Sequence, residues 1–350
     1  MMKRYIRAIG VWIGALSIGM AAIGCQVGVV ESQQLTAKAV KSFENGHFET
    51  ATSTLQQALD RDPNNGDALY WLARIDMKYQ DYQAAQLKLQ SALGIAPDNL
   101  MYSSALIEAH QRYGERLARE GDFDAAIGAF GSCARAAKDH VDRDRYDAEA
   151  HLNRARCLRQ ARDYRAAAQA YEMAIRANPF LKDDMGTTVH YKELAELYKS
   201  FGFFDSAIRV LNNGILNNID DGMLEITLAD VLRAKGNFAE SLAHYERAEK
   251  YLTDKDKSIL RAIPAMYGAG MASYGLARYE ESSKNLRESG DLFIKSREWL
   301  NKYIESSHSS EDRLRRASAV QWIKIIDRKL EKDAIGNDIE EGERNLRNRK

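Results

Sequence analysis

Few residues of this 350-residue chain have the types and spacing that chemistry requires. Seven histidines are scattered, and none lies three or four residues from another, so no helix face is expected to present a pair of imidazoles to a metal. The stretch DRDRYD, from Asp142 to Asp147, spaces its carboxylates as a calcium loop does, but it lacks the turn glycine and the terminal glutamate. No nucleophile-elbow, zinc-protease, P-loop or dinucleotide-binding spelling occurs. We therefore expect no enzyme activity, no metal and no cofactor.

The composition indicates a folded helical chain without an electrostatic preference. Fifty basic and fifty acidic residues give zero net charge, which removes the main reason to expect nucleic acid as a partner. The hydrophobic fraction of 45% is enough to build a core. Only four prolines occur, and good helix formers are abundant. The elements that position any functional residue should therefore be helices.

The N-terminus combines a basic head with an apolar run and a cysteine. Lys3, Arg4 and Arg7 precede an uncharged run over residues 8–24, which is longer than most signal-peptide cores and shorter than a typical membrane span. The residues AIGC at 22–25 resemble the lipobox of bacterial lipoproteins, although Ala22 stands where that motif usually has Leu. The resemblance implies a signal peptide over 1–24, a lipid on Cys25 and a short tether over 25–31. A plain cleaved signal ending near Ala21 and an uncleaved anchor are the alternatives.

Each of these alternatives places the rest of the chain outside the cytoplasm or at a membrane. In the lipoprotein family, Gln26 rather than Asp after the cysteine resembles an outer-membrane sorting signal. We expect an outer-membrane lipoprotein that faces the periplasm. Inner-membrane anchoring and secretion are the alternatives.

A repeat organises most of the remaining chain. An aromatic residue recurs with spacings of 34, 41, 41, 40, 34 and 41 residues, at Phe48, Tyr82, Phe123, Tyr164, Phe204, Phe238 and Tyr279. Small residues follow each aromatic at offsets of three and ten, and Leu, Phe or Tyr follows at an offset of seven. These offsets share one helical stripe, so the pattern predicts closely packed helices. Three prolines at an offset of fifteen mark helix ends.

This pattern resembles the tetratricopeptide repeat. The resemblance implies an all-α, right-handed superhelical solenoid of about seven helix pairs over residues 32–296. Capping helices should follow over 297–335, and a charged, frayed tail over 336–350. Spacings that exceed 34 by six or seven residues amount to about two helical turns, so they predict lengthened helices, for example over residues 100–120.

In the tetratricopeptide family the concave wall is lined by positions 15, 12, 8, 5 and 4 residues before each aromatic. Carried over to this sequence, these positions supply a set of cations and an apolar end, so we expect a protein or peptide partner whose acidic segment binds the cations. The alternative is a solvated helix face whose charges pair with each other. The cations are Arg74, Lys78, Arg156, Arg159, Lys192 and Lys199, and the apolar end is Tyr267, Met271 and Tyr274.

The repeat register also brings two cysteines near each other. Cys133 falls late in one helix and Cys157 in the first helix of the next pair. An oxidising compartment would allow them to form a disulfide. Buried free thiols are the more common state, so we expect two thiols and keep the disulfide as the alternative.

The sequence thus favours a membrane-anchored scaffold or adaptor that assembles a bacterial cell-envelope complex. The resemblance suggests pilus or secretion machinery, outer-membrane assembly or cell-wall machinery. One alternative is an envelope sensor that binds a peptide or a cell-wall fragment in the concave groove. Another is an enzyme whose active site lies in residues 280–350, where the sequence offers no cluster of polar groups.

Overall fold

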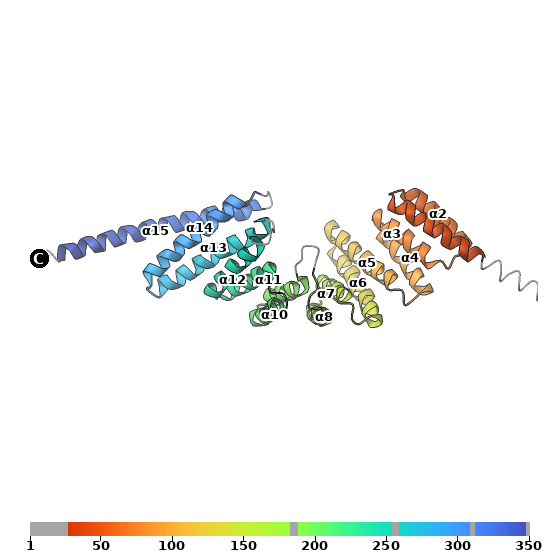
Figure 1. Cartoon of the computed structure of the whole chain (residues 1–350), viewed down its shortest axis with the longest axis horizontal. Coiled ribbons are helices and arrows are strands. Elements are labelled where there is room, and N and C mark those ends of the chain that lie inside the picture. The colour runs from red at the N-terminus through yellow and green to blue at the C-terminus, as the bar shows by residue number, and fades with distance from the viewer. Residues whose placement is uncertain (1–26, 183–187, 254–258, 309–311, 348–350) are drawn as a thin grey trace, which may run out of the picture. The chain divides into compact units, whose positions relative to one another are not determined.

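A computed structural model of the chain describes residues 27–182, 188–253, 259–308 and 312–347. Across these ranges the regular structure is helical and contains no strand (Figure 1). The chain divides into two compact units, residues 1–177 and 178–350, and each is described by itself. The expected signal peptide and Cys25 lie outside the described residues. Residues 27–44 form the first described helix, so most of the expected tether over 25–31 is helical instead.

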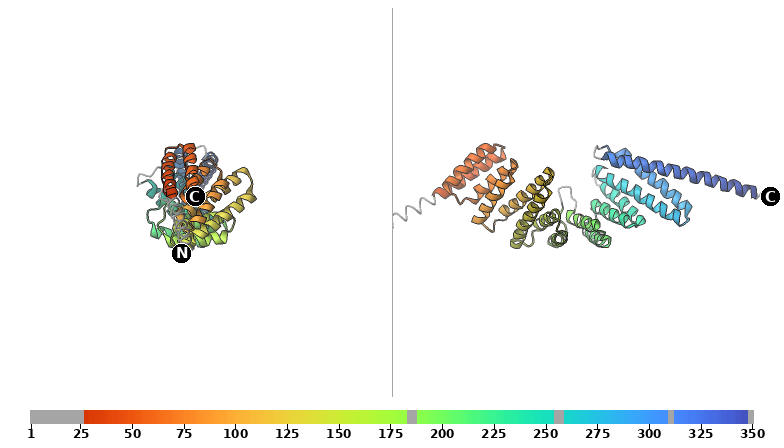
Figure 2. Two further views of the ribbon diagram at one scale, coloured as in Figure 1. Left: turned by 90° about the vertical axis from the view of Figure 1, so that its right-hand side faces the viewer. Right: turned by 180° about the vertical axis from the view of Figure 1, so that it is seen from behind.

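Unit 1 consists of antiparallel helix pairs joined by short turns (Figure 2). Each second helix buries one stripe, as the offsets of three, seven and ten predicted, and Leu55 and Leu89 are completely buried on it. Small residues at the other two offsets let the neighbouring helix approach. After the helix over 27–44, the helices are α2 (Phe48–Arg61), α3 (Gly66–Lys78), α4 (Tyr82–Ile95), α5 (Leu100–Glu120), α6 (Phe123–Arg143), α7 (Ala148–Gln160) and α8 (Tyr164–Ala177).

Unit 2 continues the same architecture and ends on one long helix. Its fifth helix lies against both neighbours through glycines, and a β-carbon on Gly268 would overlap the buried ring of Tyr245. The helices are α9 (Val189–Ser200), α10 (Phe204–Asn217), α11 (Gly222–Lys235), α12 (Phe238–Thr253), α13 (Ile259–Ser282), α14 (Leu286–Ser306) and α15 (Arg313–Arg347). Seven helix pairs followed by a C-terminal helix confirm the predicted fold class for the described residues.

Every turn inside a helix pair contains a residue with left-handed backbone, two positions before the second helix. Glycine removes the steric penalty of that conformation, and it occupies four of the seven turns. The residue that follows caps the second helix in several pairs, for example Asp81 and Asp122, whose carboxylates accept the amides of Ala84 and Ala125. The left-handed residues are Gly46, Gln80, Gly121, Arg162, Gly202, Gly236 and Lys284.

The seventh pair has a different register from the predicted one. Helix α13 runs through Tyr279 to Ser282, and α14 begins at Leu286, so Leu286 takes the position that the sequence pattern assigned to Tyr279. The hydroxyl of Ser289 donates to the Ala277 carbonyl at 2.9 Å, as that of Ser241 in the preceding pair donates to the Ala229 carbonyl at 2.8 Å. The shift is seven residues, or about two helical turns, and therefore leaves the apolar stripe on the same face.

The C-terminal boundaries also differ from the predicted ones. Helix α14 ends at Ser306, ten residues beyond the predicted limit of 296 for the solenoid. Helix α15 follows as the predicted capping helix, but it continues to Arg347, where we expected a frayed tail from 336. None of the described helices has both the length and the apolar character that a membrane span requires.

Candidate functional site

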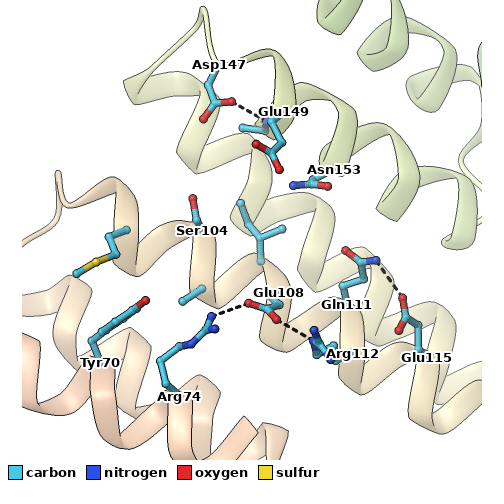
Figure 3. Close-up of a pocket in the computed structure, with 14 residues that line it drawn as sticks. Tyr70, Arg74, Ser104, Glu108, Gln111, Arg112, Glu115, Asp147, Glu149 and Asn153 are labelled. Atoms are coloured by element: carbon cyan, nitrogen blue, oxygen red, sulfur yellow. Dashed lines mark hydrogen bonds and ion pairs between the residues drawn. The ribbon is translucent and has the colours of Figure 1, made fainter. Parts of the chain in front are cut away.

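A cavity of about 620 Å³ lies in unit 1, where three successive first helices face a common space (Figure 3). Helix α3 contributes Tyr70 and Arg74, α5 contributes the central wall, and α7 contributes the opposite rim. Several of the lining residues occupy the groove positions that the repeat register gives for these pairs. The polar residues of the central wall and the rim include Ser104, Glu108, Gln111, Arg112, Glu115, Asp147, Glu149 and Asn153.

The charges that line this cavity are predominantly acidic. Glu108 binds both arginines, since Arg74 Nη1 lies 2.8 Å from its Oε2 and Arg112 Nε lies 2.8 Å from its Oε1. The two guanidinium groups are therefore already paired. The lining holds four carboxylates against these two cations, so the cavity carries a net negative charge.

The other acids differ in how well they are satisfied. Asp147 accepts the Ala150 amide through Oδ1 and lies 2.9 Å from His140 Nε2 through Oδ2, so both of its oxygens are used. Glu115 receives one hydrogen bond, from the Gln111 amide at 3.0 Å. Glu149 is exposed and has no hydrogen bond or ion pair with any described residue. The carboxylates of Glu115 on α5 and Glu149 on α7 thus retain oxygen atoms that can accept a hydrogen bond from a ligand.

Tyr70 is a buried residue whose hydroxyl lies at the base of the site. Its side chain is 9% exposed, and its ring stacks on Tyr102 with a centroid distance of 5.7 Å. Figure 3 shows the Tyr70 hydroxyl directed into the cavity, and it makes no hydrogen bond with the described residues. The Tyr102 hydroxyl, in contrast, donates to Asp67 at 2.6 Å, and burial together with that carboxylate raises the pKa of Tyr102.

The six predicted cations are divided between the two units. Arg74 lines the cavity but is paired with Glu108, while Lys78, Arg156 and Arg159 lie in unit 1 outside its lining. Lys192 and Lys199 lie on α9 in unit 2, and the former is 4.0 Å from Glu196. Arg74 and Lys192 each lie near an acidic residue of the same unit, as the alternative of mutually paired charges predicted. Tyr70 and Glu149 occupy predicted groove positions, but neither was among the predicted site residues because only the cations were considered.

The predicted apolar end is covered by α15. The Tyr267 hydroxyl lies 3.3 Å from Ser318 Oγ, and the Tyr274 ring contacts Trp322 at a centroid distance of 4.8 Å. Arg315 also lies over the Tyr267 ring. The register shift contributes to this difference, because positions counted from Leu286 make Met271 and Tyr274 the first groove residues of the last pair and exclude Tyr267. Tyr267 and Tyr274 are therefore packing residues of unit 2.

A serine, a histidine and an aspartate line up beside the cavity. His140 Nδ1 lies 2.7 Å from Ser103 Oγ, and its Nε2 lies 2.9 Å from Asp147 Oδ2. The serine hydroxyl is buried, also contacts the Leu100 carbonyl, and does not line the cavity, so no substrate can reach it from there. These hydrogen-bonded side chains connect α5 and α6 to the start of α7 and thereby position the cavity wall. No group of three potential metal ligands occurs among the described residues.

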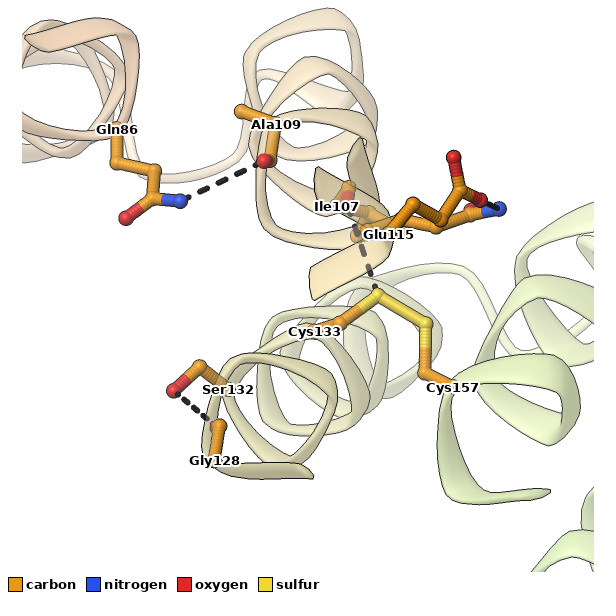
Figure 4. Close-up of a disulfide and its surroundings, with 9 residues drawn as sticks. Gln86, Ile107, Ala109, Glu115, Gly128, Ser132, Cys133 and Cys157 are labelled. Carbon is orange, nitrogen blue, oxygen red and sulfur yellow. Dashed lines mark hydrogen bonds between the residues drawn. A yellow bond between two sulfur atoms is a disulfide. The ribbon is translucent and has the colours of Figure 1, made fainter. Parts of the chain in front are cut away.

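Cys133 on α6 and Cys157 on α7 form a disulfide (Figure 4). Their Cα atoms are 5.8 Å apart, and both side chains are buried. The predicted proximity is confirmed, whereas the preference for two free thiols is wrong. Sequence spacing indicates which residues meet, but it contains no information about the redox compartment that decides between the two states.

Comparison with known proteins identifies the family. Helix pairs with a polar concave cavity define a protein-interaction solenoid. Two family models described as tetratricopeptide repeat match residues 42–113 and 112–181, so this part of the chain consists of tetratricopeptide repeats. No curated protein matches the sequence.

Solved structures share the helical-repeat arrangement at low identity. A tetratricopeptide repeat protein from Parabacteroides merdae is 18% identical, with a TM-score of 0.44, and the match covers 85% of this chain and 98% of that one. PilW, described as a type IV pilus biogenesis factor, is 19% identical with a TM-score of 0.40, and the match covers 66% and 97%. MamA is 19% identical with a TM-score of 0.40, and the match covers 54% and 93%.

Proposed function

We propose that this chain is a membrane-anchored scaffold that holds a partner protein during assembly of a bacterial cell-envelope complex. The observation that supports this function is the cavity between α3, α5 and α7, which combines the unpartnered hydroxyl of Tyr70 with two carboxylates that have few internal partners. Such a concave wall is suited to an extended segment or a helix of another protein. The protein acts by binding, without catalysis of its own.

The proposed location rests on the N-terminus and the disulfide. A basic head, an apolar run and the residues AIGC occur in the order that a lipoprotein signal requires, so we propose acylation of Cys25. The Cys133–Cys157 disulfide supports an oxidising compartment such as the periplasm. Gln26 favours the outer membrane. Mass spectrometry of the purified N-terminus should find a diacyl or triacyl cysteine, and an intact Met1 would contradict the anchor.

Site-specific photo-crosslinking tests the binding role. A benzoyl-phenylalanine residue in place of Ser104 would lie on the exposed central wall of the cavity, and the same residue in place of Glu49 would lie outside it. Irradiation of cells that carry the full chain should give a discrete protein adduct at position 104 and none at position 49. Equal adducts at both positions, or none at either, would overturn a groove-bound partner. A small adduct at position 104 alone would favour the envelope sensor.

A further inference from the structure

We infer that the cavity of unit 1 selects a cationic segment of its partner, with an arginine or lysine side chain bound by Glu149 or Glu115. This inference rests on the proposed scaffold function and specifies the chemistry of the partner. The inferred charge of the partner segment is opposite to the one that the sequence pattern predicted, because that prediction counted the cations of the groove without their internal partners.

The electrostatic argument depends on which charges are already compensated. Arg74 and Arg112 share the single carboxylate of Glu108, so this group of three residues retains one positive charge. Glu115 on α5 and Glu149 on α7 are exposed, and neither forms an ion pair with a described residue. Together with Asp147 they give the cavity lining its net negative charge, and a guanidinium or ammonium group that binds either glutamate would not displace an existing ion pair. Arginine could bind one of them through two parallel hydrogen bonds.

The hydroxyl of Tyr70 is a second, independent indication of a ligand. Tyr70 is 9% exposed, and a tyrosine that is buried to this extent normally finds a hydrogen-bond partner for its polar atom. This hydroxyl has none among the described residues and is directed into the cavity (Figure 3). A backbone carbonyl of a bound segment would accept its proton. This backbone carbonyl of the bound segment would lie toward α3, and the cationic side chain of the segment would lie toward α5 and α7.

An anionic segment and a metal ion fit the same cavity less well. An acidic side chain would meet Arg74 and Arg112 already bound to Glu108, and it would face the two remaining carboxylates. Glu115 and Glu149 come from different helices, and the described residues contain no group of three potential metal ligands.

Two peptides of opposite charge provide the test. Fluorescein-labelled (Ser-Arg)4 and (Ser-Glu)4 should be titrated with the detergent-solubilised full chain at low and at physiological salt, and followed by fluorescence anisotropy. We expect the arginine peptide to bind at least tenfold more tightly than the glutamate peptide. Because the contacts are charged and partly exposed, its affinity should fall as salt rises.

Matched variants locate the effect in the cavity. The double variant E115Q/E149Q should weaken binding of the arginine peptide about tenfold, whereas E49Q/D139N removes the same charge from exposed positions outside the cavity and should change it less than twofold. Y70F removes only the hydroxyl and should weaken binding of both peptides several-fold. Circular dichroism spectra and thermal unfolding midpoints should match the unmodified chain for all of these variants.

Three results would overturn the inference: tighter binding of the glutamate peptide, no binding of either peptide, or equal weakening by E115Q/E149Q and E49Q/D139N. None of these results would by itself remove the proposed scaffold function. A crosslinked protein at position 104 would then still indicate a groove-bound partner, but one that is not recognised through positive charge.

Discussion

The concave helices of the two units present different surfaces, although both are built from the same repeat. In unit 1, α3, α5 and α7 line a polar cavity that contains Tyr70 and two carboxylates with few partners. In unit 2, the aromatic side chains of α13 pack against α15, and Tyr274 and Trp322 lie in contact. The same helix position therefore lines an open cavity in one unit and packs against a covering helix in the other.

The difference depends on which groups already have partners. Apolar residues of α13 gain a cover because Trp322, Ile326 and neighbouring residues of α15 extend the core of unit 2. Polar residues around the unit 1 cavity have partly satisfied groups and no covering helix among the described residues. An aromatic groove position on its own is consequently a weak indicator of a binding site, and a hydroxyl that faces a cavity without a partner in the protein is a stronger one.

The largest expected effect comes from the covalent bond that joins two walls of unit 1. The Cys133–Cys157 disulfide closes a loop with a sequence separation of 24 residues, for which chain entropy predicts about 3 kcal/mol of stabilisation. We expect the double variant C133A/C157A to speed amide hydrogen exchange in α6 and α7 and to leave α13 and α14 unchanged. Equal acceleration in both units would contradict their independent stabilities, and unchanged exchange in α6 and α7 would contradict a stabilising disulfide.

A somewhat smaller effect is expected from removal of the cover in unit 2. W322A deletes the ring that contacts Tyr274, and loss of a partly buried aromatic side chain should destabilise unit 2 by about 2 kcal/mol. V320A shortens an exposed side chain of the same helix and is the matched control. Hydrogen exchange in α13 and α14 should increase for W322A alone. If it does not, α15 is a loosely attached element and the apolar face of α13 becomes a candidate binding surface.

The sequence could predict the helix pairs but only part of the site. Offsets of three, seven and ten from an aromatic are sufficient to identify the buried stripe, because the stripe is a property of one helix. The register of the last pair was missed because seven residues return the stripe to the same face. The turn residues contained a signal for the correct register. The other turns place Gly, Gln or Arg two residues before the second helix, and Lys284 and Asn285 fit that turn better than Ala277 and Arg278 do.

The sign of the net charge that lines the cavity could not be obtained from the groove positions alone. Glu108 pairs with Arg74 of the preceding helix pair and with Arg112 of its own helix, and only the first of these contacts depends on how neighbouring pairs stack. The missing partner of Tyr70 is likewise a property of the packed structure. Sequence reasoning identifies which side chains face the groove, whereas their mutual contacts decide what remains for a ligand.

A buried histidine gives unit 2 a pH-dependent stability. Burial lowers the pKa of His190 from its ordinary value near 6.5 to about 4. The unfolded chain therefore binds more protons between these two values, so stability is full above pH 6.5 and falls as the pH drops toward 4. Between pH 7 and pH 5 the loss should be roughly 1–2 kcal/mol.

Urea unfolding at pH 7 and pH 5, followed by hydrogen exchange in α9 and α10, measures this loss. H190Q keeps a neutral polar side chain and should reduce the difference between the two pH values, whereas H308Q at an exposed position should preserve it. His110 in unit 1 also has its pKa lowered to about 4, by burial and by Arg135, so the exchange must be read helix by helix. A pH difference that is equal in H190Q and in the unmodified chain would show that His190 is not its source.

The smallest expected effect concerns the turns that both units share. Gly46, Gly121, Gly202 and Gly236 adopt left-handed backbone without steric penalty, whereas Lys284 adopts φ +63° with a β-carbon. K284G should stabilise the α13–α14 turn by about 0.5–1 kcal/mol, because relief of that strain exceeds the added freedom of glycine in the unfolded chain. G236A is the reciprocal variant in the preceding pair and should lower stability by a similar amount. Thermal unfolding of both variants tests the register as well as the turn. If α14 instead began at Tyr279, Lys284 would lie inside a helix, and K284G would be destabilising by about 1 kcal/mol.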